Sequence, residues 1–184
     1  MIQWKTILTA ASFGAILTIS VVIVQGLSAY AVSGPTSVKW VAGVEPVCTM
    51  AGPGSCPDVA ATSNGHTITI AGDGTLNIHS KSVTGIGTFV EKDSSGAVLA
   101  SGTWTATQLL SFNSYGTSPP FPSFAVGGQA LIRIHLSTGA DGILTVTCLI
   151  GSPPAGKMEG VELAIQGGPN FNREVSGDTV FILA

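Results

Sequence analysis

The sequence predicts an all-β domain, either a single antiparallel β-barrel or a β-sandwich of about eight to nine strands, preceded by an N-terminal hydrophobic signal helix. Three observations predict this fold. Short segments alternate polar and apolar residues, which is the period of a half-buried strand. Clusters of Gly, Asp and Ser separate these segments, as turns do. Only 9% of the 184 residues are charged and 24 are Gly, a composition that suits close-packed strands better than long charged helices.

Residues 1–31 have the organisation of an export signal. Lys5 precedes an uncharged, mostly apolar stretch from Thr6 to Val24, and small residues follow it. Ala29-Tyr30-Ala31 is an A-x-A pattern, which predicts cleavage after Ala31. The apolar stretch is also about long enough to span a bilayer, so an uncleaved anchor stays open. In both cases we expect the domain outside the cytoplasm, either secreted, on the outer cell surface or in a periplasm.

Nine segments of the remaining chain are predicted as strands. Residues 66–70 and 75–80 are predicted to form a hairpin through the turn at 71–74. Residues 43–65 contain three prolines and are predicted to be irregular. The domain organisation is therefore a leader at 1–31, an N-terminal strand and irregular Gly/Pro loop at 32–65, and the β-barrel or sandwich at 66–184. The predicted strands are 37–42, 66–70, 75–80, 87–92, 97–108, 129–136, 142–150, 160–166 and 179–183.

The architecture of glycine-rich, helix-poor strands after a leader resembles that of small secreted β-barrels, such as lipocalin-like and dirigent-like proteins. The likeness is one of architecture and not of motif. No residue role can be carried over from it.

The three cysteines are Cys48, Cys56 and Cys148. Export permits disulfides, and Cys48 and Cys56 flank a short loop rich in Gly and Pro, so we predict a bond between them. Cys148 lies within an apolar strand and is predicted to be a buried free thiol. Because the count is odd, pairing of Cys148 with either partner or with another chain stays open.

One segment, 112–128, carries four aromatic residues together with three prolines. The aromatics are Phe112, Tyr115, Phe121 and Phe124. A proline-stiffened loop of this kind is suited to form a preorganised binding rim for a sugar face or an apolar ligand. The alternative interpretation is a lid that folds onto the end of the β-domain and plugs its core.

Arg133 and His135 alternate with the aliphatic residues of 129–136 and therefore point to one face. If the aliphatic residues fill the core, both polar side chains are simply exposed. If the strands enclose a lumen, Arg133 is a candidate to hold an anionic group and His135 to move a proton, with Glu162 as the acid placed to join them. The other acids near predicted turns are expected to be solvated, namely Glu91, Glu159, Glu174 and Asp178.

The segment 151–157 matches the G-x-x-x-x-G-K pattern of a phosphate-binding loop, but its details argue against one. Met158 stands where Ser or Thr would hold magnesium. Pro153 and Pro154 lack the backbone N–H groups that a phosphate cradle requires. The residues that follow alternate like a strand and not like a helix. We therefore predict a turn that connects two strands.

Composition and charge exclude further classes of partner. The net charge is −3 and no run of basic residues occurs, so nucleic acid is not a predicted partner. A membrane is a predicted partner only through an uncleaved leader. Nothing makes His66, His79 and His135 converge, so neither a metal nor another cofactor is predicted.

The sequence favours an exported extracellular or cell-envelope domain that is non-catalytic, either a ligand-binding protein or a structural matrix protein. A small-molecule or glycan ligand and self-association both stay open. The alternative is a small barrel enzyme, an isomerase or cyclase acting on an apolar substrate. A second alternative is a filament subunit, in which residues 32–42 complete the sheet of a neighbouring copy.

Overall fold

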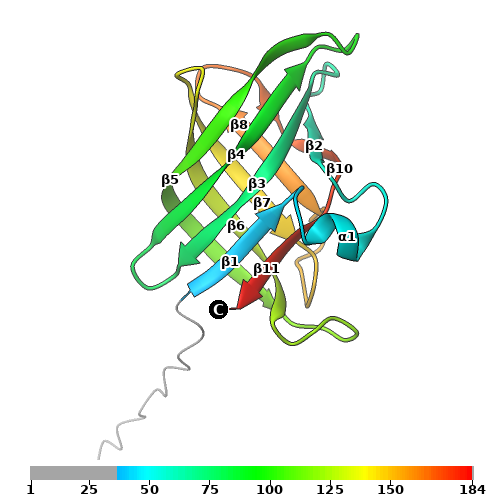
Figure 1. Ribbon diagram of the computed structural model, residues 1–184, viewed down its shortest axis with the longest axis vertical. Helices are drawn as coiled ribbons and strands as arrows, with labels where there is room; N and C mark the ends of the chain where they lie inside the picture. Colours follow the sequence, from blue (N-terminus) through cyan, green and yellow to red (C-terminus); the bar gives the residue numbers. More distant parts are fainter. Residues whose placement is uncertain (1–36, 184) are drawn as a thin grey trace, which may run out of the picture. The chain divides into compact units, whose positions relative to one another are not determined.

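The computed structural model describes residues 37–183, in which eleven antiparallel strands form one sheet and confirm the all-β class (Figure 1). The elements are β1 (Ser37–Ala42), α1 (Val47–Ala51), β2 (Asp58–Ala61), β3 (Thr67–Asn77), β4 (Ser82–Lys92), β5 (Val98–Gly116), β6 (Ala125–Leu136), β7 (Asp141–Cys148), β8 (Gly160–Ile165), β9 (Asn170–Phe171), β10 (Arg173–Ser176) and β11 (Thr179–Leu183). The predicted signal helix and its cleavage point lie outside the described residues. Within residues 37–183, no helix has the length and apolarity needed to cross a membrane.

The strand pairings of this sheet return to their starting strand. β3 pairs with β4, β4 with β5, and β5 with β6. β6 also pairs with β11, β11 with β1, and β1 with β3. The other strands extend this ring, because β7, β8 and β9 continue from β6 while β2 and β10 continue from β3. Figure 1 shows the strands wrapped around a common interior.

Two stacked tryptophans fill one part of this interior. The ring centroids of Trp40 in β1 and Trp104 in β5 are 5.6 Å apart, and both side chains are buried. Glycines opposite them make the space: a Cβ atom added at Gly85 would lie 2.7 Å from the Trp40 ring, and one at Gly87 would lie 2.4 Å from the Trp104 ring. The region is therefore closely packed and holds its aromatic rings directly against backbone.

The indole N–H groups of these two tryptophans differ in their hydrogen bonding. Trp104 Nε1 donates a hydrogen bond to the carbonyl oxygen of Thr88 at 3.2 Å. Trp40 Nε1 is buried without a hydrogen-bond partner. One neutral donor is thus left unsatisfied in an otherwise apolar region.

Two predictions about the chain before residue 80 are wrong. β3 runs without interruption through 71–74, where we predicted a turn. Gly72 and Gly74 suggested that turn, but both lie in the strand. A Cβ at Gly72 would meet the Trp104 ring at 2.4 Å, so glycine is needed there for packing and not for a turn. Residues 43–65 are also not wholly irregular, since they contain α1 and β2. β1 and β2 both pair with β3, so residues 37–65 share the sheet of the later strands.

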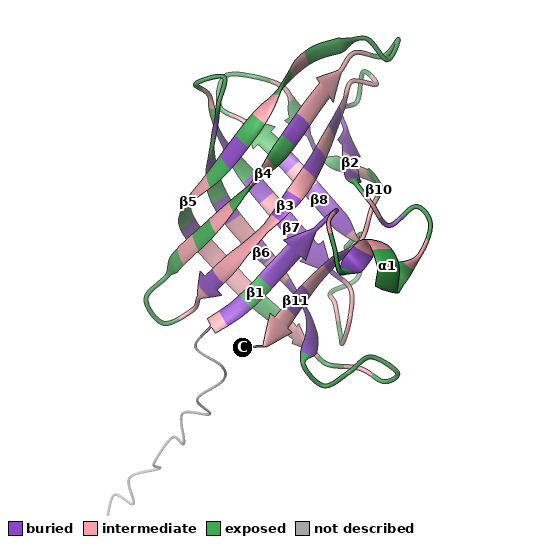
Figure 2. Cartoon of the chain, viewed as in Figure 1, coloured by how far each residue is buried: buried purple, intermediate pink, exposed green. Residues whose placement is uncertain are grey.

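The outer face of β4 and β5 is built largely from hydroxyl side chains. Figure 2 shows exposed residues alternating with less exposed ones along these strands. The exposed threonines are Thr84, Thr88, Thr103, Thr105 and Thr107. This face is polar without being charged, which agrees with the low charge of the sequence.

Candidate functional site

Arg133 and His135 lie on the outer face of β6. Both are exposed, whereas Ile132 and Ile134 of the same strand are fully buried. Glu162 is half-buried on the outer face of β8. The lumen interpretation is therefore wrong for these three side chains. The alternation of β6 sends its aliphatic residues inward and its polar residues outward.

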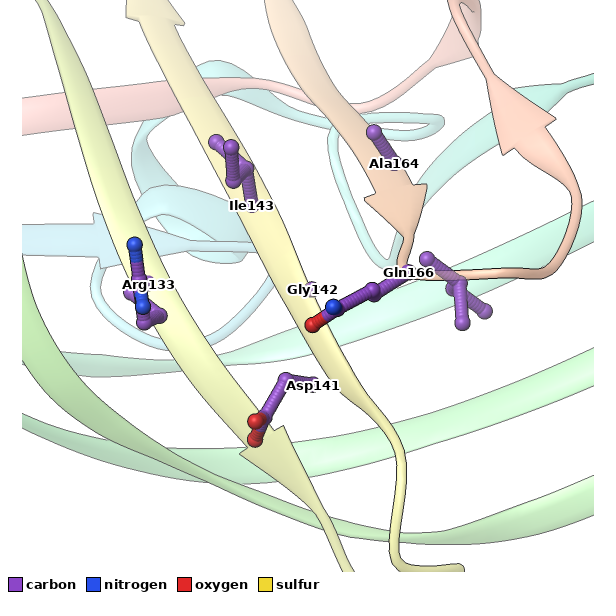
Figure 3. Close-up of a pocket in the computed structure, with 7 residues that line it drawn as sticks. Arg133, Asp141, Gly142, Ile143, Ala164 and Gln166 are labelled. Atoms are coloured by element: carbon purple, nitrogen blue, oxygen red, sulfur yellow. The ribbon is translucent and has the colours of Figure 1, made fainter.

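A groove on this outer face contains Arg133 but neither His135 nor Glu162 (Figure 3). Its lining residues are Arg133, Asp141, Gly142, Ile143, Ala164, Ile165 and Gln166. Asp141 Oδ1 lies 2.8 Å from His135 Nδ1, and both side chains are half exposed. Water screens an exposed pair of this kind, so it contributes little energy. The polar side chains that the groove offers a ligand, those of Arg133, Asp141 and Gln166, are all exposed.

The four aromatic residues of 112–128 do not act together. Phe112 belongs to β5, and its ring meets that of Phe181 with centroids 5.0 Å apart, so it packs against the core. Tyr115 also belongs to β5. Phe121 and Phe124 lie in the connection to β6 and remain about half exposed. The segment thus divides into a part that packs inward and a loop that is free to contact a ligand.

Phe121 lines a second pocket, which we call the α1 pocket. Its volume is about 250 Å³. Its apolar lining residues are Val47, Met50, Ala51, Phe121, Ala125, Cys148, Ile150 and Val180. Its polar lining residues are Glu159, Asp178 and Thr179. Segments from α1 to β11 therefore meet around one cavity.

The cysteines are placed as the sequence predicted. Cys48 and Cys56 lie at disulfide-bonding distance, with their sulfurs 2.10 Å and their Cα atoms 5.3 Å apart. This pair closes the segment that carries most of α1. Cys148 is a buried free thiol, and burial, followed by the charge of Glu159, raises its pKa to about 12. Such a thiol stays protonated and is a poor nucleophile.

Glu159, which lines the α1 pocket, holds three segments of the chain together. Its Oε2 accepts a hydrogen bond from the N–H of Leu149 at 2.6 Å. Its Oε1 accepts from the N–H and the hydroxyl of Thr179 at 2.9 and 3.0 Å. Burial raises the pKa of Glu159, and these hydrogen bonds oppose that rise. The expectation that Glu159 is solvated is wrong, because it is half-buried where β7 ends and β11 begins.

Asp58, the first residue of β2, is fully buried and neither of its carboxyl oxygens has a hydrogen-bond partner. Glycine backbone closes around it: a Cβ at Gly177 would lie 2.1 Å from Asp58 Oδ1, and one at Gly43 would lie 3.2 Å from Oδ2. Desolvation, and then the charges of Glu159 and Asp178, raise the pKa of Asp58 from 3.8 to about 8. Asp58 is therefore mostly neutral at pH 7.

Asp58, Glu159 and Asp178, together with α1, form what we call the acidic corner. Asp178 is half-buried, contrary to the expectation that it is solvated, and its N–H donates to the carbonyl oxygen of Ser55 at 2.9 Å. The corner can accept hydrogen bonds and attract positive charge. Sequence reasoning did not single out Asp58, and the only available signal was an acid at the start of a short apolar segment.

Other candidate sites have simpler explanations. Residues 151–157 lie in the connection between β7 and β8, as predicted. In the described part of the chain, no group of three or more His, Cys, Asp or Glu side chains is placed to hold a metal ion. Comparisons with protein-family models, curated proteins and solved structures find no match for this chain.

Proposed function

We propose that this chain is an exported, non-catalytic binding domain that holds a small, mainly apolar molecule in the α1 pocket. The observation that carries the proposal is the composition of that pocket. Its lining combines apolar side chains from several separate segments with two acids and a threonine. Pockets of this kind, with a few convergent polar groups in an apolar lining, are typical small-molecule sites.

The proposal includes a closed barrel and export from the cytoplasm. A ring of strand pairings is what a closed barrel requires, and that ring supports the barrel over a sandwich. The A-x-A leader and the Cys48–Cys56 pair at bonding distance favour an oxidising compartment. Because Trp40 and Trp104 pack one part of the interior, we place the ligand away from them, beside α1.

The two alternative functions have less support. A barrel isomerase or cyclase would need Arg133, His135 and Glu162 to converge inside the barrel, and they lie on its outer face. A donor-strand filament would need a first strand that is free to leave. β1 instead pairs with both β3 and β11 of its own domain.

The test is an NMR titration of the purified protein with hexanol, a small neutral amphiphile. We expect saturable shifts of backbone amides around Val47, Ala51 and Val180. Ala51→Trp places a large ring at the pocket wall from an exposed position and should abolish these shifts. Val98→Trp adds the same ring at an exposed site outside the pocket lining and should leave them intact. Shifts that never saturate, or that centre on the groove beside Arg133, would contradict the proposal.

A further inference from the structure

We infer that the occupant of the α1 pocket is a small organic cation, such as a primary amine on an apolar body. The inference rests on the proposed function and names the ligand class for the same site. Its starting point is the sign of the groups around the cavity. The polar lining consists of Glu159, Asp178 and Thr179, and no Lys, Arg or His is among the lining residues.

Glu159 presents a carboxyl group held in a fixed position in the pocket lining; burial raises its pKa and its hydrogen bonds lower it. It accepts hydrogen bonds from Leu149 and Thr179 through both of its carboxyl oxygens. A carboxylate that accepts from two backbone N–H groups and a hydroxyl is favoured in its ionised form. Because three donors hold it, Glu159 cannot swing away to find a cation in solvent. A positive charge that compensates Glu159 must therefore be supplied by a cation that binds in the pocket.

Asp178 adds a second carboxylate that no basic side chain neutralises. The ion pairs of the described residues are Lys39–Asp73 and His135–Asp141, and neither involves this corner. The hydrogen bond from Asp178 N–H to Ser55 O fixes its backbone beside the segment that carries α1. The pocket therefore places a cation within the field of two acids in partly dehydrated surroundings, where charge attraction is stronger than in water.

Asp58, which lies outside the pocket lining, also has no positively charged partner among the described residues. Its carboxyl group is fully buried and both oxygens are unpartnered. The charges of Glu159 and Asp178 help to raise its pKa to about 8. A cation bound near the same two acids would offset their effect and lower the pKa of Asp58. Binding should therefore release part of a proton at pH values near 8.

The apolar walls define the rest of the ligand. Val47, Ile150 and Val180 offer contact for an aliphatic or aromatic body. Phe121 adds a ring whose face attracts a cation. An anion would be repelled by Glu159 and Asp178, and among residues 37–183 no group of three or more His, Cys, Asp or Glu side chains is placed to hold a metal ion. An organic ammonium ion matches both parts of the lining, because its body contacts the apolar side chains and its charge lies near Glu159 and Asp178.

The experiment compares three probes of equal chain length, namely hexylamine, hexanol and hexanoate, by calorimetry. We expect hexylamine to bind at least about tenfold more tightly than hexanol, a ratio that falls with added salt, and hexanoate to bind more weakly than both. Repeating the hexylamine titration in buffers of different ionisation enthalpy should reveal the proton released by Asp58. This release is a readout that simple apolar binding would not produce.

Two variants locate the charge. Asp178→Asn should reduce the ratio of hexylamine to hexanol affinity severalfold. Asp73→Asn removes an acid from the exposed pair with Lys39 and should leave the ratio unchanged. If hexanol binds at the α1 pocket and hexylamine binds no more tightly, the cation inference is wrong while the proposed function stands. If none of the probes binds there, both are wrong.

Discussion

The tryptophan centre, where Trp40 and Trp104 stack, and the acidic corner show two opposite ways of filling the interior of one sheet. In the tryptophan centre, large rings lie against glycine backbone, and the only unsatisfied group is one neutral indole N–H. In the acidic corner, glycine backbone closes instead around a carboxyl group that has no partner. In both regions glycine allows backbone to approach a side chain closely. That side chain is an aromatic ring in the tryptophan centre and a carboxyl group in the acidic corner.

This comparison identifies the acidic corner as the place where the fold departs from the packing that stability alone would favour. An apolar side chain at position 58 would satisfy the corner better than an unpaired acid does. Local departures of this kind are expected at functional sites, where proteins depart from the arrangement that stability favours. The contrast is therefore a reason to look for function at the corner.

The largest expected effect is the removal of the Asp58 charge. The folded state holds the Asp58 proton more tightly than the unfolded chain does, so this group makes the free energy of unfolding fall as pH rises from about 4 to about 8. The full shift corresponds to a loss of the order of 5 kcal/mol. Asp58→Asn should lack this loss and exceed the wild type in stability above pH 8. Urea titrations across this pH range measure the difference.

The control for this prediction is Asp141→Asn, which removes an exposed acid. It should leave the slope of stability against pH almost as in the wild type, because burial of Asp58 is unaffected. An unchanged slope in Asp58→Asn would show that the corner does not hold a neutral acid, and the contrast with the tryptophan centre would fail.

The next largest effect is expected in the tryptophan centre. Trp104→Ala should lower the free energy of unfolding by about 4 kcal/mol at all pH values, because it leaves a large cavity among rigid strands. Ile86→Ala on the neighbouring strand is the control, since Ile86 is 67% exposed and its loss should cost less than about 0.5 kcal/mol. Similar losses for both variants in urea titrations would contradict the packing described here.

The smallest effect concerns the covalent closure beside the α1 pocket. Replacing Cys48 and Cys56 together by Ala should lower stability by about 2 kcal/mol, because only a short loop is released. The loss should also weaken hexanol binding, since α1 carries part of the pocket wall. Wild-type protein in reducing buffer should match the double variant. Reduced protein that keeps full affinity would show that the pocket does not depend on this closure.

Much of the later half of the fold could be predicted, because its strands alternate plainly and turns separate them. The segments 129–136, 142–150, 160–166 and 179–183 correspond to β6, β7, β8 and β11 within a few residues. The earlier half was harder to predict because a pair of glycines can indicate either a turn or a close approach of backbone to a side chain within a strand. Gly72 and Gly74 are a turn signal locally, and only contacts with distant residues, Trp104 for Gly72 and Thr84 for Gly74, show why glycine stands there inside a strand.

The candidate site was less predictable for the same reason. Phe121 was recognised from its loop, and it does line the α1 pocket. Asp58 was missed because its burial depends on Gly43 and Gly177, which come from opposite ends of the domain. Arg133 and His135 attracted attention by their chemistry, but alternation within a single strand cannot say whether a barrel has a lumen or a packed core.

The exposed threonines of β4 and β5 have a consequence for handling the protein in solution. A face of hydroxyls offers few charges for counterions to screen, so moderate sodium chloride should alter solubility only slightly. Sulfate and phosphate act differently, because their exclusion from the surface favours any state that hides area from solvent. We therefore expect early salting-out with ammonium sulfate, which offers a gentle first step for purification.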